Sequence, residues 1–304
     1  MCFLLPTITV SRIERKTMEV ISIVIPVYNE EIAIGDDLDL IKQTMDATGK
    51  PYEVIVVNDG STDRTDEIVA SRPWVKLLRH DRNRGTGAAR NTGLKAARGD
   101  IIIMTDGDGT YPNQDMPRLL QCMEKCDMVI GARTQEKGTL KLLRTPAKWF
   151  IRSLASYLTG TKIPDLNSGF RAFRRDIAFK YLNILPDTHS WVSTITIAFL
   201  SDGYSVQYIP IEYYKRKGKS KFHPIRDTYN YITLVVRTVT YFNPLKVFMP
   251  ISLSLFTVGV LKAFYDIVAY RFHFAPSTVL LLLTAVQIAA LGLLADLIVR
   301  RGGR

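Results

Sequence analysis

The sequence has few of the residues from which disulfide frameworks and zinc sites are built. Its 304 residues include only three cysteines and four histidines. This excludes a disulfide-stapled fold and favours a reducing compartment. Cys122 and Cys126 are four residues apart on an expected helix, where they could hold a metal. Because the histidines are few and scattered, we expect two unpaired structural thiols instead.

Two common phosphate-binding loops are also missing. No P-loop pattern is present, and the GTG of residues 85–87 is followed by AAR, which does not complete the pattern G-x-G-x-x-G. These absences exclude a P-loop NTPase and a dinucleotide-binding loop of the Rossmann type.

Acidic residues are outnumbered by basic ones. Forty Lys and Arg against 29 Asp and Glu give a formal net charge of +11. Such a charge suits a nucleic acid, an anionic membrane surface or an anionic substrate. Because the sequence has no RNA-binding aromatic signature and many basic residues approach an apolar C-terminal part, we expect a membrane surface and phosphate-bearing ligands, and no nucleic acid.

The first ten residues are apolar, but no basic region precedes them and they are too short to cross a bilayer. We interpret them as neither a signal peptide nor an anchor. Met18 stands directly before the first convincing strand, so residues 1–17 are expected to be an N-terminal extension.

Strand and helix signals alternate in the first half of the chain, within a domain expected to span residues 18–224. Apolar, β-branched runs are typical of strands buried on both faces of a sheet. They stand at residues 20–27, 52–57, 75–79, 100–105 and 128–130. Helical stretches separate them, and the first of these is expected to be opened by Asn29, Glu30 and Glu31. This alternation predicts an α/β domain with a mainly parallel sheet. Ligands of such sheets gather at the carboxyl ends of the strands, where polar loops stand at 28–30, 59–63 and 106–110.

The C-terminal part of the chain is far more apolar. Residues 247–270 and 278–299 are each long enough to span a hydrocarbon core of about 30 Å. A buried helical hairpin of a soluble protein is the alternative. The preceding stretch, 225–245, could be a core helix, but its position favours a juxtamembrane helix in the membrane interface. Residues 246–304 are therefore expected to form a transmembrane hairpin with a basic tail.

Charges flank and interrupt this hairpin. Lys and Arg gather before the first span and after the second, whereas the connecting loop offers only Arg271 and His273. The positive-inside rule then predicts two spans with the large domain and both termini in the cytoplasm. Lys262 and Asp266 are four apart, so they share one helix face and could pair with each other or contact the neighbouring helix. Short spans with such internal charges would gain from association into a homo-oligomer.

Two carboxylates, Asp106 and Asp108, follow the strand expected at 100–105. One residue apart in a loop, they can hold a divalent cation from one side and leave its other positions to phosphate oxygens. Mg²⁺ and Mn²⁺ prefer such ligands. The metal would neutralise charge on a departing nucleoside diphosphate.

Asp59 has a similar setting after an apolar strand. Its carboxylate could accept hydrogen bonds from a nucleobase N–H or from ribose hydroxyls. Alternatively, Asp59, Ser61 and Asp63 cap the helix that follows.

Seven motifs stand in the order found in one enzyme family. They are SIVIPVYNEE, VNDGSTD, NRGTGAARNTG, DGDGTYP, GAR, NSGFRAF and KRKGKSKF. Over residues 19–225 the sequence resembles family 2 glycosyltransferases of the GT-A fold, and more narrowly polyprenyl-phosphate glycosyltransferases of the dolichol-phosphate mannose synthase type. The subgroup with a C-terminal membrane hairpin shares the paired spans. The resemblance implies a Rossmann-like GT-A catalytic domain.

On the donor side, the resemblance implies the following roles. The nucleoside pocket would be lined by Pro26, Tyr28, Glu30 and Asp59. Asp106 and Asp108 would bind Mg²⁺ or Mn²⁺ and the donor diphosphate. Thr110 would be the third metal residue, at a position where relatives often have a Gln ligand, or water could replace that ligand here. Arg216 and Lys221 resemble the basic loop that closes over the diphosphate.

On the acceptor side, Arg133, Arg144 and Ser168 would bind a phosphate. The resemblance implies that the catalytic residues are Asp108, Arg133 and Arg171. For Arg171 the alternative is a salt bridge beneath the sheet.

The nature of the acceptor follows from the bases available. A sugar hydroxyl needs a general base, normally a carboxylate beneath the acceptor. Residues 188–201, where many relatives acting on hydroxyls have an acidic pair, contain no Asp or Glu. A lipid phosphate has a second pKa of about 6 and needs cations rather than a base. Asp165 is still available as a base, so this comparison favours a phosphate without excluding a hydroxyl.

The resulting hypothesis is an inverting, metal-dependent transfer of a sugar from a nucleotide diphosphate-sugar to polyprenyl (dolichyl or undecaprenyl) phosphate at the cytoplasmic membrane face. One alternative is transfer to a hydroxyl of a glycolipid or glycan. Another is a non-catalytic membrane scaffold that retains a nucleotide-binding domain.

Overall fold

A computed structural model describes residues 19–134, 153, 155–157, 159–188, 190–215, 233, 236, 240–241, 243–269 and 274–302. The expected N-terminal extension lies outside these residues, as does most of the interface helix expected at 225–245. Arg144, Arg216 and Lys221 also lie outside them.

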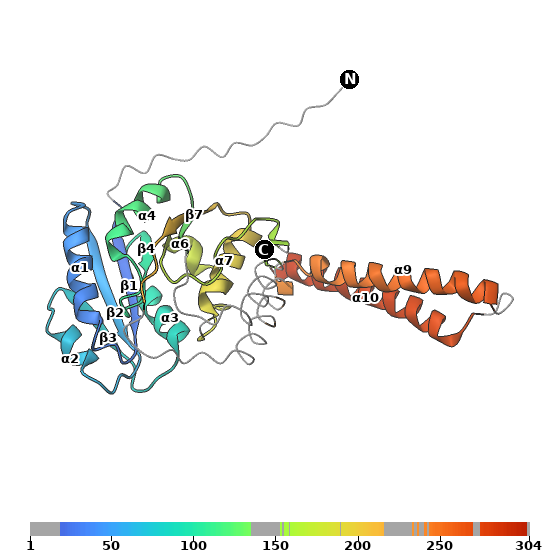
Figure 1. Ribbon diagram of the computed structural model, residues 1–304, viewed down its shortest axis with the longest axis horizontal. Helices are drawn as coiled ribbons and strands as arrows, with labels where there is room; N and C mark the ends of the chain where they lie inside the picture. Colours follow the sequence, from blue (N-terminus) through green and yellow to red (C-terminus); the bar gives the residue numbers. More distant parts are fainter. Residues whose placement is uncertain are drawn as a thin grey trace, which may run out of the picture.

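A seven-stranded sheet forms the centre of the catalytic region (Figure 1). Its strands are β1 (Ile21–Val27), β2 (Tyr52–Asn58), β3 (Val75–Arg79), β4 (Ile101–Met104), β5 (Met128–Arg133), β6 (Arg171–Arg174) and β7 (Val206–Ile211). They are ordered β3-β2-β1-β4-β6-β5-β7. Strand β6 is antiparallel to both of its neighbours, and every other pair is parallel. The predicted α/β class with a mainly parallel sheet is confirmed.

The central strands are apolar on both faces, as the continuous runs in the sequence predict. In β1, Ile23 and Ile25 belong to one core cluster, whereas Val24 belongs to the other. Successive side chains of a strand point to opposite faces, so an uninterrupted apolar run serves two layers of helices.

Helices cover each face of the sheet. One layer holds α1 (Ile34–Asp46), α2 (Thr65–Ala70), the short 3₁₀ helix η1 (Asn113–Asp115) and α4 (Met116–Met123). The other holds α3 (Thr86–Ala96), α6 (Arg175–Phe179) and α7 (Trp191–Ser201). Helices α1, α3, α4 and α6 bury apolar residues against the sheet, and α7 is buried on nearly every side. This covering leaves the polar loops at the strand ends.

The polar stretch after β1 forms a turn, whereas the sequence predicts that it opens a helix. Asn29 has a positive φ of 56°, and its Oδ1 accepts the Thr62 N–H at 2.8 Å. Helix α1 begins only at Ile34. The prediction failed because Asn29 bonds to the loop after β2, which is distant in sequence, instead of capping the next helix.

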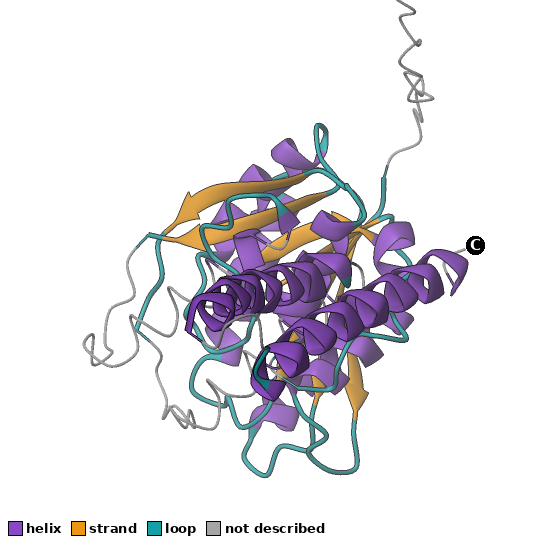
Figure 2. Cartoon of the chain, turned by 90° about the vertical axis from the view of Figure 1, so that its right-hand side faces the viewer, coloured by secondary structure: helices purple, strands orange, loops and turns teal. Residues whose placement is uncertain are grey.

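Two long helices, α9 (Leu245–Ala269) and α10 (Pro276–Gly302), form a hairpin that projects from the domain (Figures 1 and 2). They pack closely along their length: a Cβ on Gly259 would lie 2.8 Å from the Leu282 side chain. Ser252 Oγ also donates to the Ala285 carbonyl at 2.8 Å. Within the described residues, 245–269 and 276–299 are the two helices long and apolar enough to cross a membrane.

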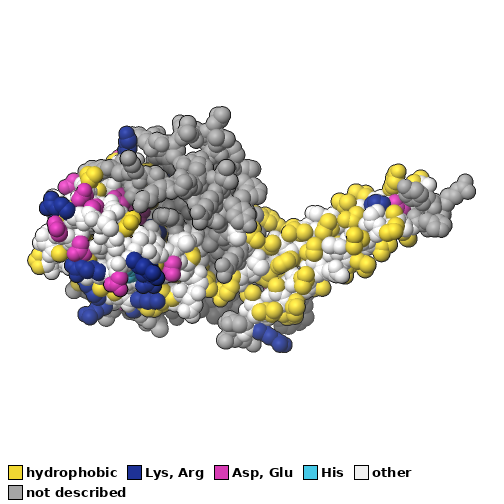
Figure 3. Space-filling model, turned by 90° about the horizontal axis from the view of Figure 1, so that it is seen from below, with side chains coloured by type: hydrophobic (Ala, Val, Ile, Leu, Met, Phe, Trp, Pro, Cys, Tyr) yellow, Lys and Arg dark blue, Asp and Glu magenta, His cyan; other side chains and the backbone are white. Residues whose placement is uncertain are grey.

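The outer face of the hairpin is apolar and exposed, with Val268 at 84% and Leu253 at 65% exposure. In Figure 3, hydrophobic side chains cover most of the hairpin, whereas most of the charged side chains lie on the α/β domain. Exposed apolar surface of this extent is unfavourable in water. The alternative of a buried hairpin in a soluble protein therefore fails, and the arrangement is that of a membrane protein.

Asp266 joins the two helices where α9 ends and α10 begins. Its carboxylate accepts the Ala275 N–H at 2.9 Å and the Thr278 hydroxyl, and it pairs with Lys262 at 3.0 Å. The sequence left open whether Lys262 and Asp266 pair with each other or contact the neighbouring helix. In the structure Asp266 does both.

Candidate active site

Strand β6 determines which loops meet at the ligand-binding edge. Because it runs antiparallel, its first residue, Arg171, lies opposite Met104 on one side and Ile130 on the other. The loop before β6, residues 167–169, therefore reaches the edge where β4 ends before Asp106 and where β5 ends at Arg133. This one antiparallel strand therefore brings the loop of the predicted metal residues, at Asp106, next to the loops of the predicted phosphate-binding residues, at Arg133 and Ser168.

The loop that carries Asp106 and Asp108 is braced from beneath. The Asp37 carboxylate, on α1, accepts the Gly109 N–H at 2.9 Å and the Asn113 side-chain amide at 3.0 Å. Thr105 in turn donates to Asn113 Oδ1 at 2.8 Å. Asp37 is 6% exposed. Sequence reasoning missed this buried acid, although an acid inside the apolar stripe of an amphipathic helix is a signal for it.

Asp108 is held by its own loop. Thr110 donates both its backbone N–H and its hydroxyl to Asp108 Oδ1, at 3.2 and 2.5 Å. Thr110 is completely buried, so its hydroxyl orients the carboxylate. Whether Thr110 also contacts a metal stays a prediction. The described residues include no group of three or more His, Cys, Asp or Glu arranged to hold a metal. A cation bound by Asp106 and Asp108 would thus need oxygens from a ligand, as Mg²⁺ and Mn²⁺ readily accept.

Asp106 is paired with a residue that sequence reasoning did not assign. Arg90, on α3, donates to Asp106 Oδ1 at 2.7 Å. The Arg90 side chain is 5% exposed, and its guanidinium carbon lies 5.9 Å from the centroid of the Trp191 ring. Its Nε has no hydrogen-bond partner in the part of the chain that the structure describes. One signal in the sequence was available: the small residues 85–89, GTGAA, directly before Arg90. Small residues let a helix pack closely against neighbouring backbone, and such packing would bury the arginine that follows. Gly87 does pack directly against the backbone of Pro186 and Asp187.

Asp59 braces a neighbouring loop. Its carboxylate accepts the N–H groups of Arg84 and Gly85 at 2.9 and 2.8 Å, and it lies 2.7 Å from His80 Nδ1. Asp59 is 2% exposed. The helix-capping alternative holds only for Asp63, which accepts the Thr65 N–H at 3.0 Å. The assignment of Asp59 to the nucleoside pocket stays a prediction, and this geometry gives it a positioning role.

The other residues predicted for the nucleoside pocket lie at the end of β1. Pro26 is buried within the strand, and Tyr28 and Glu30 follow it, both partly exposed. The Glu30 N–H donates to Thr65 Oγ1 at 2.9 Å, which ties this loop to the start of α2.

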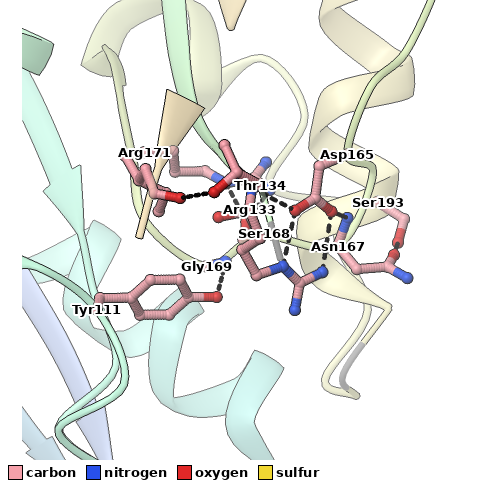
Figure 4. Close-up of polar contacts among 10 residues, drawn as sticks. Tyr111, Arg133, Thr134, Asp165, Asn167, Ser168, Gly169, Arg171 and Ser193 are labelled. Carbon is pink, nitrogen blue, oxygen red and sulfur yellow. Dashed lines mark hydrogen bonds and ion pairs between the residues drawn. The ribbon is translucent and has the colours of Figure 1, made fainter. Parts of the chain in front are cut away.

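Arg133, predicted to bind a phosphate, forms a two-pronged ion pair with Asp165 (Figure 4). Its Nε and Nη2 donate to the two Asp165 oxygens at 2.7 and 2.9 Å, and its backbone N–H donates at 3.2 Å. Burial alone would raise the pKa of Asp165, but the hydrogen bonds and charge of Arg133 hold the pKa below its ordinary value. Asp165 therefore stays ionised and engaged, which makes it a poor general base.

Ser168 and Arg171 are both completely buried. Arg171 donates to the carbonyls of Ser168 and Val192 and to Thr196 Oγ1, and no carboxylate in the described part of the chain pairs with it. Burial, and then the charge of Arg90, lower the pKa of Arg171 to about 10, so it remains a cation near neutral pH. These contacts correct the salt-bridge alternative, because the partners of Arg171 are carbonyl and hydroxyl oxygens rather than an acid. The assignment of Arg171 as a catalytic residue stays a prediction, and its complete burial gives it a position beneath the site. Ser168 Oγ has no hydrogen-bond partner among the described residues.

Two family matches accord with this geometry. Residues 22–182 match the family described as Glycosyl transferase family 2. The chain belongs to that family. Residues 243–300, which include most of α9 and α10, match the GtrB C-terminal hairpin family. As a member of glycosyl transferase family 2, the chain is a glycosyltransferase enzyme, and the resemblance found in its motifs is confirmed.

Two relatives extend the comparison. The undecaprenyl-phosphate 4-deoxy-4-formamido-L-arabinose transferase of Edwardsiella ictaluri is 30% identical over 213 residues, which cover 68% of this chain and 64% of that protein. The dodecaprenyl-phosphate galacturonate synthase of Rhizobium johnstonii is 27% identical over 302 residues, covering 92% of this chain and 88% of that protein.

A solved structure shares the fold. The glucosyl-3-phosphoglycerate synthase of Mycobacterium tuberculosis, crystallised with Mn²⁺, UDP and phosphoglyceric acid, has a TM-score of 0.58 and 20% identity. The match covers 73% of this chain and 78% of that one. It supports the GT-A-like architecture of the family 2 domain.

Proposed function

We propose that this glycosyltransferase moves a sugar from a nucleotide diphosphate-sugar to a polyprenyl phosphate, with inversion at the anomeric carbon and with Mg²⁺ or Mn²⁺. The observation that carries the proposal is the lack of a carboxylate available as a base among the described residues on the acceptor side of the site. Helix α7 contains no Asp or Glu, and Asp165 is bonded to Arg133. A hydroxyl acceptor would lack a base there, whereas an ionised phosphate needs none. The names of both relatives, which refer to polyprenyl phosphates, support the same acceptor.

On the donor side, Asp106 and Asp108 would hold the metal together with the diphosphate. A bound divalent cation neutralises charge that develops on the leaving group. Thr110 keeps the Asp108 carboxylate in one orientation. Arg90 does the same for Asp106 and places a buried positive charge beside it. We assign the nucleoside to the ends of β1 and β2, with Pro26, Tyr28, Glu30 and Asp59, and the closing basic loop to Arg216 and Lys221.

On the acceptor side, Arg133 would position the lipid phosphate. Its two-pronged bond to Asp165 fixes the guanidinium, and its planar face lies 5.2 Å from the Tyr213 ring. A fixed guanidinium loses little freedom when it binds a phosphate oxygen. Ser168 would offer its unpartnered hydroxyl, and Arg144 a second cation. Arg171 would act through the loop that it supports rather than by touching substrate.

The hairpin would keep this edge at the bilayer, where a lipid phosphate lies at the surface. We place the catalytic domain and both termini in the cytoplasm, because basic residues such as Lys246 and Arg301 flank the outer ends of the two spans. Association into a homo-oligomer is part of the same proposal.

Transfer in detergent micelles tests this function. Purified full-length protein is given undecaprenyl phosphate, Mn²⁺ and radiolabelled UDP-glucose, UDP-N-acetylglucosamine or GDP-mannose. A polyprenyl-phosphate sugar is cleaved by mild acid, whereas an ordinary glycoside survives. An acid-stable product in native membranes would favour a hydroxyl acceptor. Nucleotide binding without turnover would favour a scaffold.

Two matched variants accompany this assay. Asp108→Asn is expected to lower transfer by about 100-fold or more, because an amide is a poor metal ligand. Asp115→Asn removes a partly buried carboxylate from η1, where it pairs with the exposed Arg118, and should leave transfer unchanged. Full activity in Asp108→Asn would contradict the metal assignment.

A further inference from the structure

The loop that carries the metal ligands and the loop predicted to hold the acceptor phosphate touch at Gly169. A Cβ at position 169 would lie 2.8 Å from Asp106 Oδ2 and 3.3 Å from Arg90 Nη2. Gly169 does not have a positive φ, so the requirement is for space and not for an unusual backbone conformation. Even one methyl group here would displace the Asp106 carboxylate or the arginine that holds it.

A second contact joins the same two loops. The hydroxyl oxygen of Tyr111, three residues after Asp108, accepts the Gly169 N–H at 2.7 Å (Figure 4). The Tyr111 ring is 4% exposed; it stacks on Phe170 at 5.8 Å and meets the Tyr213 ring edge-on at 5.3 Å. Tyr213 in turn lies against Arg133. Tyr111 therefore connects the metal loop both to the acceptor loop and to the cation beside it.

The acceptor loop is also fixed from below. The Ser168 carbonyl accepts from Arg171, and Asn167 Oδ1 accepts from Ser193 on α7 at 3.0 Å. Because these bonds hold Asn167 and Ser168 in place, the part of the loop that can still shift is Gly169, where it contacts Asp106 and Tyr111. A displacement on either side of that boundary must be matched on the other, because packed groups leave no slack.

We propose that Gly169 and Tyr111 couple the two half-sites, so that the metal–nucleotide and the lipid phosphate each strengthen the binding of the other. The coupling rests on the proposed function, since it needs both ligands. It makes Tyr111 and Gly169 positioning residues, which act through Asp106 and Ser168. Coupling of this kind is reciprocal by thermodynamic necessity.

Binding measurements test the coupling directly. The probe is Mn²⁺ with equal amounts of UDP and GDP, and free Mn²⁺ is followed by its electron paramagnetic resonance signal. Full-length protein is titrated in bicelles that contain undecaprenyl phosphate or, as a control, undecaprenol. In the wild type, undecaprenyl phosphate should raise Mn²⁺ affinity about three- to ten-fold, a factor that corresponds to one or two hydrogen bonds. Undecaprenol should have no effect.

Tyr111→Phe removes only the oxygen that accepts from Gly169. Its Mn²⁺ affinity without lipid phosphate should stay within about two-fold of the wild type, while the rise on adding lipid phosphate should disappear. Tyr214→Phe is the matched control. Among the described residues the Tyr214 hydroxyl accepts a side-chain bond from the exposed Gln114, so its loss should leave the rise intact. Gly169→Ala, checked for folding by its unfolding transition, should weaken Mn²⁺ affinity even without lipid.

The coupling is wrong if the wild type shows no phosphate-dependent rise in Mn²⁺ affinity, or if Tyr111→Phe retains it. Sugar transfer to undecaprenyl phosphate in either case would leave the proposed function standing. Absence of both transfer and Mn²⁺ binding would instead remove the proposed function, and the coupling with it.

Discussion

Replacing Asp165 by asparagine separates two roles that a carboxylate beside an acceptor can have. If Asp165 holds Arg133 in place, the change removes a charge but keeps the shape and one accepting oxygen. If Asp165 is a general base, the same change removes the proton acceptor of the reaction. The two roles predict different losses of stability and different pH profiles.

The loss of stability follows from the burial of the pair. The side chains of Arg133 and Asp165 are 15% and 11% exposed, so the asparagine variant leaves a largely buried guanidinium without its counter-ion. Breaking such a pair costs about 3–5 kcal/mol, and the retained oxygen places this variant near 3 kcal/mol. For a domain of this size, that is a fall of about 6–12 °C in the unfolding temperature.

The pH dependence of stability has a definite sign. The pKa of Asp165 is lowered in the folded protein, so its stabilising effect is complete above the ordinary pKa of about 4 and disappears as the pH falls through the folded value. The wild type and Asp165→Asn should therefore differ in unfolding temperature at pH 7 and converge well below pH 4. Asp202→Asn, which removes a carboxylate bonded to Tyr181 at the far end of α7, is the matched control.

The transfer kinetics of Asp165→Asn distinguish a positioning residue from a general base. With a positioning role, Asp165→Asn should raise the KM for undecaprenyl phosphate, while the turnover rate at saturating lipid falls less than about ten-fold. The acid limb of the rate profile near pH 6 should persist, because it belongs to the lipid phosphate. If turnover instead falls by about 100-fold or more, with the acid limb lost and the unfolding temperature unchanged, Asp165 is a general base.

Two further changes test braces described above. Asp59→Ala leaves the N–H groups of Arg84 and Gly85 without their acceptor. It should therefore lower the free energy of unfolding in denaturant by about 2–4 kcal/mol. Unchanged stability together with weakened nucleotide binding would instead show that Asp59 acts only as a ligand contact. Asp266→Leu should lower the unfolding temperature of the detergent-solubilised protein. Asp266→Asn should lower it less, since asparagine can still accept the Ala275 N–H at the start of α10. Equal unfolding temperatures in the wild type and both variants would contradict the role of Asp266 in joining the two helices.

Local patterns in the sequence were sufficient to predict five of the seven strands, the two long C-terminal helices and the family, whereas β6 and β7 were not among the predicted strands. The uninterrupted apolar run of β1 predicts burial on both faces, and the length and apolar character of α9 and α10 make them candidate membrane spans, because both properties follow from the chemistry of consecutive residues. Asp106 and Asp108 were identified in the same way, from two carboxylates at a strand end. The ordered motifs made the assignment to glycosyl transferase family 2 specific, since each motif alone is common.

Partners distant in sequence were decided only by the tertiary structure. Nothing near Arg90 in the sequence indicates that it pairs with Asp106, and nothing near Asp59 indicates that it holds the loop before α3. Arg171 has the residue type of a ligand contact, yet the reversed strand β6 places it under the site. The sequence determined which groups are available, because chemistry belongs to each residue. The fold decided which of them face a ligand and which hold the others, because contacts depend on how strands pair.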